Sequence, residues 1–208
     1  HGDFVNDARL PDDEKELIER WVEAGMPEGD PKDLPAPKQY AEGWRIAKPD
    51  LVLEMSEAYA VPAEGEVPYQ YFVLDPKLTE DKWVREAECV AGNSSVVHHI
   101  IAFVVEPELA KDLEVGHFSA PAPEVRERMK RGEKVPNADG PQNMNKQIAI
   151  MRSWFTNYLV AMAPGAPPMK LLGDNAKRLR AGSKIVFQSH YTPNGAPQQD
   201  QSRIGLVF

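Results

Sequence analysis

The longest run of apolar and β-branched side chains in the chain spans residues 96–105. A continuous apolar run of this length is typical of a strand that is buried on both faces. Two adjacent histidines, His98 and His99, interrupt the run, and burying an imidazole is costly unless it finds a polar partner. A second strand-like run, residues 184–191, carries His190. Because one metal ion could satisfy all three imidazoles, we predict that His98, His99 and His190 bind it together.

A helix and a linker are predicted at the start of the chain. Asp12 or Asp13 is the expected N-cap of the helix. Four apolar residues form one stripe at helical spacing: Leu17, Ile18, Trp21 and Val22. Gly25 suits the left-handed end of the helix, and Pro27 prevents its continuation. One short helix cannot bury this stripe, so we expect it to pack onto another surface. The stretch 27–37 contains four prolines and is predicted to be a stiff linker.

Short strands with turns between them are predicted over the rest of the chain. Besides the two histidine-bearing runs, the predicted strands are residues 44–46, 51–55, 67–74, 82–88, 148–151, 153–160 and 202–208. A short helix is expected near Pro107, residues 119–146 are expected to be a polar excursion with a helix at 124–131, and residues 179–183 are expected to be a turn. About nine short strands of this kind indicate an all-β fold, an antiparallel β-sandwich. The predicted organisation is therefore residues 1–37 as helix and linker and residues 38–208 as the sandwich.

Composition narrows the possible functions. The chain has 208 residues, of which 42% are hydrophobic, which is typical of a globular protein. Its formal net charge of −8 argues against nucleic-acid binding, which needs basic patches. No apolar run approaches the ~20 residues of a membrane-spanning helix. Cys89 is the only cysteine, so an internal disulfide, a thiolate zinc cluster and a two-cysteine haem attachment are excluded. We expect Cys89 to be buried and unreactive.

Three imidazoles without a thiolate suit copper, zinc or non-haem iron. Consecutive residues of a regular strand point to opposite faces of the sheet. His98 and His99 can therefore share a metal only if the strand bends, bulges or lies at an edge at that point. The alternative is that one of these histidines is a core residue bonded to a backbone carbonyl and the other faces solvent.

Other residues are weaker candidates for the metal site. His117 is a possible fourth ligand, but it is expected to be a solvent-facing histidine of a loop. A thioether can bind Cu(I), although methionine more often fills gaps in a core. The methionines considered are Met129, Met144, Met151, Met162 and Met169. Tyr191 either orients the imidazole of His190 or packs in the core.

The two histidine-bearing stretches resemble a known family. Residues 96–103 are similar to the paired-histidine motif of the copper type II, ascorbate-dependent monooxygenases, which include peptidylglycine α-hydroxylating monooxygenase and dopamine β-monooxygenase. Residues 185–191 are similar to the strand that carries the third histidine of the same copper site. The resemblance covers residues 44–208. It implies a jelly-roll-like β-sandwich in which His98, His99 and His190 hold a copper ion that relays electrons.

The resemblance also implies partners that this chain does not contain. In the family a second copper domain activates oxygen, and it would follow Phe208; none of the residues here match its His-x-His or methionine motif. Residues 3–35 look like the last helix and exit of a bacterial c-type cytochrome domain without its haem-binding residues. The implied electron donor is an ascorbate-like small molecule or a cytochrome c domain. The implied location is the periplasm or the cell exterior.

Sequence reasoning therefore favours the copper-binding electron-relay domain of a copper-dependent monooxygenase-like oxidoreductase. Such a domain would not hydroxylate a substrate without the second copper. Two alternatives stay open. One is a non-catalytic sandwich that binds or scaffolds a cytochrome domain, with no metal. The other is a zinc or iron enzyme on a cupin-like barrel, which would usually show a closely spaced His-x-His and a carboxylate ligand.

Overall fold

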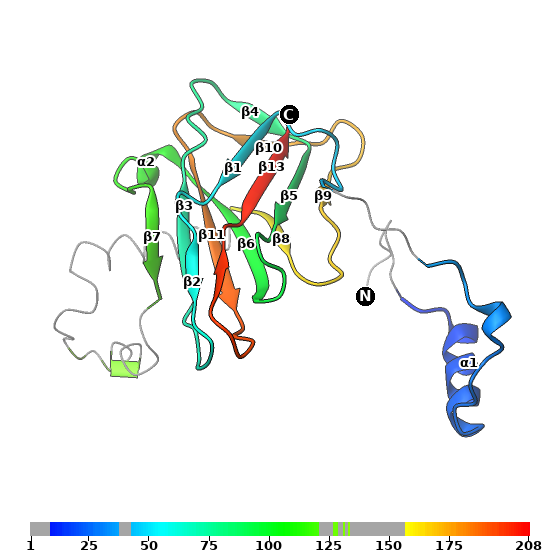
Figure 1. The fold of residues 1–208 in the computed structure, drawn as a ribbon. Helices are drawn as coiled ribbons and strands as arrows, with labels where there is room; N and C mark the ends of the chain where they lie inside the picture. The colour runs from blue at the N-terminus through cyan, green and yellow to red at the C-terminus, as the bar shows by residue number, and fades with distance from the viewer. Residues whose placement is uncertain (1–8, 38–42, 121–126, 129–130, 132, 134–156) are drawn as a thin grey trace. The chain divides into compact units, whose positions relative to one another are not determined.

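The computed structural model describes residues 9–37, 43–120, 127–128, 131, 133 and 157–208. Its internal contacts divide the chain into two units, His1–Tyr40 and Ala41–Phe208. Each unit is described by itself below, and Figure 1 shows the elements of both. No helix in the described part of the chain is long and apolar enough to cross a membrane.

The first unit contains helix α1 (Asp12–Glu23) and the 3-10 helix η1 (Pro31–Asp33). The prediction of an aspartate N-cap is wrong, because Pro11 holds that position and no side chain caps the helix. Asp12 and Asp13 instead lie in the first turn, where carboxylates interact favourably with the helix dipole. Gly25 adopts the expected left-handed conformation, with φ of +81°. The apolar stripe of α1 is exposed to solvent, so its packing onto another surface stays a prediction.

The second unit is built from antiparallel sheets. The larger sheet has five strands in the order β7 (Gly116–Ser119), β3 (Gln70–Leu74), β11 (Lys184–Tyr191), β6 (Val97–Val105) and β8 (Tyr158–Met162). The second has four strands in the order β1 (Leu51–Glu54), β13 (Arg203–Val207), β5 (Glu86–Val90) and β9 (Met169–Lys170). Two smaller ladders pair β10 (Lys177–Leu179) with β4 (Lys82–Val84) and β12 (Gln198–Asp200) with β2 (Tyr59–Val61). A short helix, α2 (Pro107–Ala110), follows β6.

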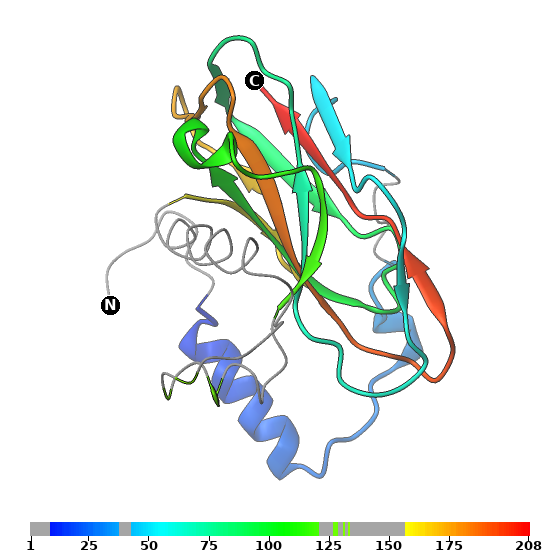
Figure 2. The same cartoon turned by 90° about the vertical axis from the view of Figure 1, so that its left-hand side faces the viewer.

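The two main sheets enclose one hydrophobic core. Alternate residues of β6, such as Ile100 and Ala102, join Phe187 of β11 on the inner face of the five-stranded sheet. Ile204 and Leu206 of β13 join the same cluster from the four-stranded sheet. Figure 2 shows red β13 beside cyan β1 and orange β11 beside green β6. This arrangement confirms the predicted antiparallel, sandwich-like all-β fold.

The outer face of the five-stranded sheet carries a second, smaller apolar cluster. It contains residues of β3, β6, β11 and α2 and of the segments that follow α2 and β7: Tyr71, Val73, Val105, Val186, Ala110, Leu113 and Ala120. The central strands are therefore buried on both faces, as the continuous apolar run at residues 96–105 predicted.

Several predicted strands differ from the structure. Residues 44–46 form no strand, because Arg45 is held in a loop by the buried carboxylate of Glu88. The predicted strand 82–88 is two strands, β4 and β5, separated at Arg85. The predicted turn 179–183 begins later, since Lys177–Leu179 is strand β10. The short helix near Pro107 is confirmed as α2.

Some predictions concern residues that the structure does not describe. The predicted strand 148–151, nearly all of the polar excursion 119–146 and the first part of the predicted strand 153–160 lie outside the described residues. Within the described part, β8 begins at Tyr158 and extends to Met162.

Candidate metal centre

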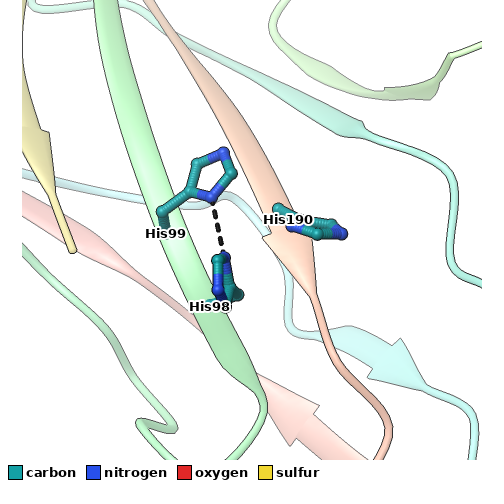
Figure 3. A group of neighbouring side chains, drawn as sticks. All are labelled: His98, His99 and His190. Carbon is teal, nitrogen blue, oxygen red and sulfur yellow. Dashed lines mark hydrogen bonds between the residues drawn. The ribbon is translucent and has the colours of Figure 1, made fainter. Parts of the chain in front are cut away.

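Three histidines from two neighbouring strands converge at one place on the five-stranded sheet. His98 and His99 lie on β6 and His190 lies on β11, and one ring nitrogen of each lies within 4.8 Å of the others. The ring centroids are 5.3 Å apart for His98 and His99, 5.1 Å for His98 and His190, and 5.2 Å for His99 and His190. Figure 3 shows the three rings grouped where β6 and β11 run side by side. The predicted residues are thus brought together.

The strand register explains how two consecutive histidines reach the same place. His190 pairs with His99, but the next residue of β11, Tyr191, pairs with Val97. The register therefore shifts at this point, and His98 is an extra residue on β6 with no partner opposite. An extra residue of this kind is a β-bulge, which bends the strand and redirects its side chains.

The burial pattern of β6 shows the same shift. Ile100 and Ala102 point into the core, so strict alternation would turn Val97 outward together with His99. Val97 is instead 5% exposed and belongs to the core cluster. The extra residue at His98 lets Val97 point into the core, while both His98 and His99 point away from it. The objection that adjacent histidines on a strand cannot share a metal therefore does not apply here.

One pair of nitrogen atoms has the separation expected of two ligands to one ion. The Nδ1 atoms of His98 and His99 lie 3.0 Å apart. Two nitrogens each 2.0–2.1 Å from the same ion lie about 2.9 Å apart at a right angle and about 3.4 Å apart at a tetrahedral angle. The Nδ1 atom of His190 is buried and has no hydrogen-bond partner among the described residues. A metal ion would supply the missing partner.

Electrostatics favours the neutral, metal-binding form of these imidazoles. Burial lowers the pKa of His99, and its neighbours His190 and His98 lower that pKa further. Burial also lowers the pKa of His190, as does His98, whereas Glu66 acts in the opposite direction. Neutral imidazole is the form that binds a metal, so no proton has to be displaced from these two rings near pH 7.

Tyr69 is a neighbour of the cluster that sequence reasoning missed. Its ring centroid lies 5.1 Å from that of His190 and 5.9 Å from that of His99. It immediately precedes β3, which pairs with β11. The sequence showed only that Tyr69 lies near the start of the predicted strand 67–74. The pairing of that strand with residues 184–191, which brings Tyr69 to the histidines, was not predictable from either run separately.

The role of Tyr191 is settled by its hydrogen bond. Its hydroxyl donates to Oδ2 of Asp200 at 2.8 Å, and both residues are 1% exposed. Burial, with the adjacent carboxylate of Asp200, raises the pKa of Tyr191. Tyr191 therefore packs in the core on the face opposite His190, and it makes no contact with the imidazoles that would orient them.

The other histidine and cysteine candidates lie elsewhere. His117 is exposed to solvent, as expected, but it lies on strand β7 and not in a loop as predicted. Its Nε2 atom lies 2.7 Å from Oε1 of Gln70, and its ring stacks on Phe72. Cys89 is buried, and burial raises the pKa of its thiol, which agrees with an unreactive cysteine. Neither residue joins the three-histidine group.

The structure describes two of the five methionine candidates, and both belong to the core. Met162 and Met169 pack against the main core cluster. Met129, Met144 and Met151 lie outside the described residues.

The three-histidine group offers three imidazole nitrogens. Among the residues that the structure describes, no carboxylate or thiolate joins the three-histidine group. His98 is exposed to solvent, so small molecules can reach the group from that side. The arrangement can hold one ion through three nitrogens and leave a further coordination position accessible.

Comparison with protein-family models, with curated proteins and with solved structures finds no match for this chain.

Proposed function

We propose that the β-sandwich is a copper-binding electron-relay domain of a copper-dependent monooxygenase-like oxidoreductase. The observation that carries the proposal is the bulge at His98, which lets His98 and His99 act together with His190. A bulge beside two histidines supports a functional role for them, because bulges commonly redirect side chains at functional sites. The jelly-roll-like topology implied by the family resemblance is part of the same proposal.

We propose copper as the metal because of the family resemblance, and three imidazoles are ligands that suit it. Imidazole suits copper, zinc, iron and nickel, whereas oxygen-activating non-haem iron sites usually use two histidines with a carboxylate. The cupin-like alternative would usually show such a carboxylate, and the group of described residues contains none. Bound copper would supply a one-electron redox couple, with a potential set by burial and by hydrogen bonds to the ligands.

The chain's own residues would have distinct roles at the site. His99 and His190 are half-buried and held neutral, so they provide a fixed pair of nitrogen ligands. His98 is exposed and completes the group from the solvent side. Tyr69 covers part of the group through its contacts with the rings of His99 and His190, which limits access of water there.

The electron donor of this proposal approaches the exposed side of the group. An ascorbate-like reductant or a cytochrome c domain would meet His98 first, because this histidine is the most exposed of the three. Substrate hydroxylation would take place on a second copper domain after residue 208. The periplasm or the cell exterior suits both partners.

Metal analysis after copper reconstitution and dialysis tests the proposal. We expect about one copper per chain and an EPR spectrum of the oxidised protein with nitrogen couplings from imidazole. Retention of zinc that copper does not displace would favour the hydrolase or oxygenase alternative. A protein that retains no metal would contradict the proposal and leave the scaffold interpretation.

A further inference from the structure

A surface pocket lies at the end of the sandwich away from the histidines. Trp83, Arg85, Asp174, Asn175 and Phe208 line it, and its volume is about 590 Å³. Small-molecule sites commonly have volumes of ~300–1,000 Å³. Strand β4, which carries Trp83, and the end of β11 that carries His190 lie at opposite ends of the sandwich in Figure 1. The pocket is therefore independent of the proposed copper site.

Backbone hydrogen bonds fix the shape of the pocket. The amide of Arg85 donates to the carbonyl of Val207 at 2.8 Å, and the amide of Leu171 donates to the carbonyl of Arg85 at 3.0 Å. The side-chain amide of Asn175 donates to the carbonyl of Leu172 at 2.6 Å, which holds the loop in a turn. The three segments that form the pocket are thus joined without a ligand, so binding needs little ordering of the chain.

Trp83 presents its indole ring at the pocket. The residue is 57% exposed, although tryptophan is among the side chains with the largest apolar surface and is highly buried on average. Phe208 supplies a second aromatic ring to the same pocket. An exposed indole combines a flat apolar face with one N–H donor, which suits a ligand that has an apolar face and polar edges.

Two side chains of opposite charge face the same pocket without partners. Arg85 and Asp174 are both exposed to solvent, and no described residue forms a hydrogen bond or ion pair with either side chain. Arginine only donates hydrogen bonds, and an ionised aspartate only accepts them. An anionic ligand would be repelled by Asp174 and a cationic ligand by Arg85. A hydroxyl group both donates and accepts, so neighbouring hydroxyls can satisfy both side chains.

We propose that this pocket binds a sugar residue of a neutral polysaccharide. A pyranose ring has an apolar C–H face that stacks on the indole of Trp83. The hydroxyls on its rim donate to Asp174 and to the free side-chain oxygen of Asn175, and they accept from Arg85. The polysaccharide would attach the chain to a carbohydrate surface without taking part in redox chemistry.

Affinity electrophoresis of the whole chain tests this proposal. Native gels would contain xyloglucan, hydroxyethylcellulose, laminarin or galactomannan, with a polysaccharide-free gel as reference. We expect at least one of these polysaccharides to retard the protein. Trp83→Ala should weaken that retardation at least tenfold, because it removes the stacking face. Asp174→Asn should weaken it less, because the amide oxygen still accepts a hydrogen bond but carries no charge. Circular dichroism and thermal unfolding check that both variants fold.

Trp21→Ala is the matched control, because Trp21 is also exposed, at 48%, but belongs to α1 in the other unit. Its retardation should equal that of the unchanged protein. Absence of retardation by all four polysaccharides would overturn the proposal. Retardation that survives both Trp83→Ala and Asp174→Asn would overturn the assignment to this pocket. Copper binding is measured separately, so failure of either proposal is distinguishable from failure of the other.

Discussion

His98 and His99 are consecutive residues of one strand, yet their Nδ1 atoms lie 3.0 Å apart. In a regular strand these side chains would point to opposite faces of the sheet. The close approach exists because His98 is the extra residue of a bulge, opposite the step from His190 to Tyr191. The geometry of the three-histidine group thus depends on how β6 and β11 pair, as well as on the identity of the ligands.

Replacing His99 with alanine should abolish stoichiometric copper binding and leave the sandwich folded. His99 supplies one of the three nitrogens, and its side chain is not part of the main core cluster. We expect the thermal midpoint of the metal-free protein to change by no more than ~3 °C, as for a loss below 1 kcal/mol. Metal analysis and circular dichroism measure the two effects.

His117→Ala is the control for this substitution. His117 is an exposed histidine of the same five-stranded sheet, and it lies outside the three-histidine group. Copper stoichiometry should remain at the value of the unchanged protein. Equal loss of copper in both variants, or in neither, would contradict the ligand assignment.

Deleting His98 should remove the bulge and preserve the fold. Val97 already pairs with Tyr191, and His99 already pairs with His190, so the deletion joins two segments whose register is correct. We expect a folded sandwich with copper affinity as low as that of His98→Ala. Thermal unfolding and copper titration of the two variants provide the comparison.

Deleting Ile101 is the matched control for the bulge. Ile101 lies where the pairing of β6 with β11 is regular, opposite Gln188. A deletion there moves the side chains on one side of it to the wrong face of the sheet. The variant should fail to fold or unfold at a much lower temperature. Similar stability of both deletion variants would argue against the bulge.

The metal-free protein should lose stability as the pH falls through about 6.5. Burial lowers the pKa values of His99, His117 and His190 in the folded protein, whereas an unfolded histidine keeps its ordinary value. Between these values the unfolded chain binds more protons, so acid favours unfolding in that window. Urea midpoints at about pH 7.5, 6.5 and 5.5 and constant ionic strength test this direction.

Bound metal should make this loss steeper, because protons then compete with the metal for the same nitrogens. The variant His117→Gln removes one titrating group away from the cluster and should flatten the metal-free profile partly. A urea midpoint that is constant or rises on acidification would contradict the prediction.

Replacing Arg45 with alanine should destabilise the sandwich by about 1–3 kcal/mol, because the side chain of Glu88 is buried whereas that of Arg45 is 44% exposed. The carboxylate of Glu88 is 3% exposed and accepts bonds from Nε of Arg45 at 2.6 Å and from its backbone amide at 2.7 Å. Removing the guanidinium leaves a buried charge with one remaining bond. Chemical unfolding measures the loss.

The exposed pair of Arg178 and Asp81 offers a comparison. Its side chains are 55% and 35% exposed, and exposed ion pairs contribute ~0–1 kcal/mol. Arg178→Ala should therefore cost much less than Arg45→Ala. Equal costs would show that burial of Glu88 is not the determining factor.

The apolar runs predicted the strands that form the centre of the fold. Residues 96–105 and 184–191 became β6 and β11, because a continuous apolar run has no stable alternative to burial between layers. The strands that were missed are short, and the ladder of β2 and β12 shows why. Gln198–Asp200 contains no apolar residue, so its pairing with Tyr59–Val61 depends on backbone hydrogen bonds that leave no pattern in the sequence.

The candidate site was predictable as a set of residues but not as a geometry. Histidines within apolar runs marked His98, His99 and His190, because a buried imidazole needs a partner. The bulge depends on which residue of β11 faces which residue of β6, and neither strand carries that information without the other. The misplacement of His117 has the same origin, since Gly116–Ser119 is a strand only through its pairing with β3.

Strand order also constrains how the chain acquires its structure. β13 lies between β1 and β5, and β11 lies between β3 and β6, so the middle of each sheet is filled by a segment from late in the sequence. During synthesis, the edges of the early strands that pair with β11 or β13 stay unpaired until these later segments have been made. Pairing over such separations closes long loops and is slow. In newly made chains, folding therefore competes with aggregation through the unpaired strand edges, and chaperones would raise the yield of folded protein.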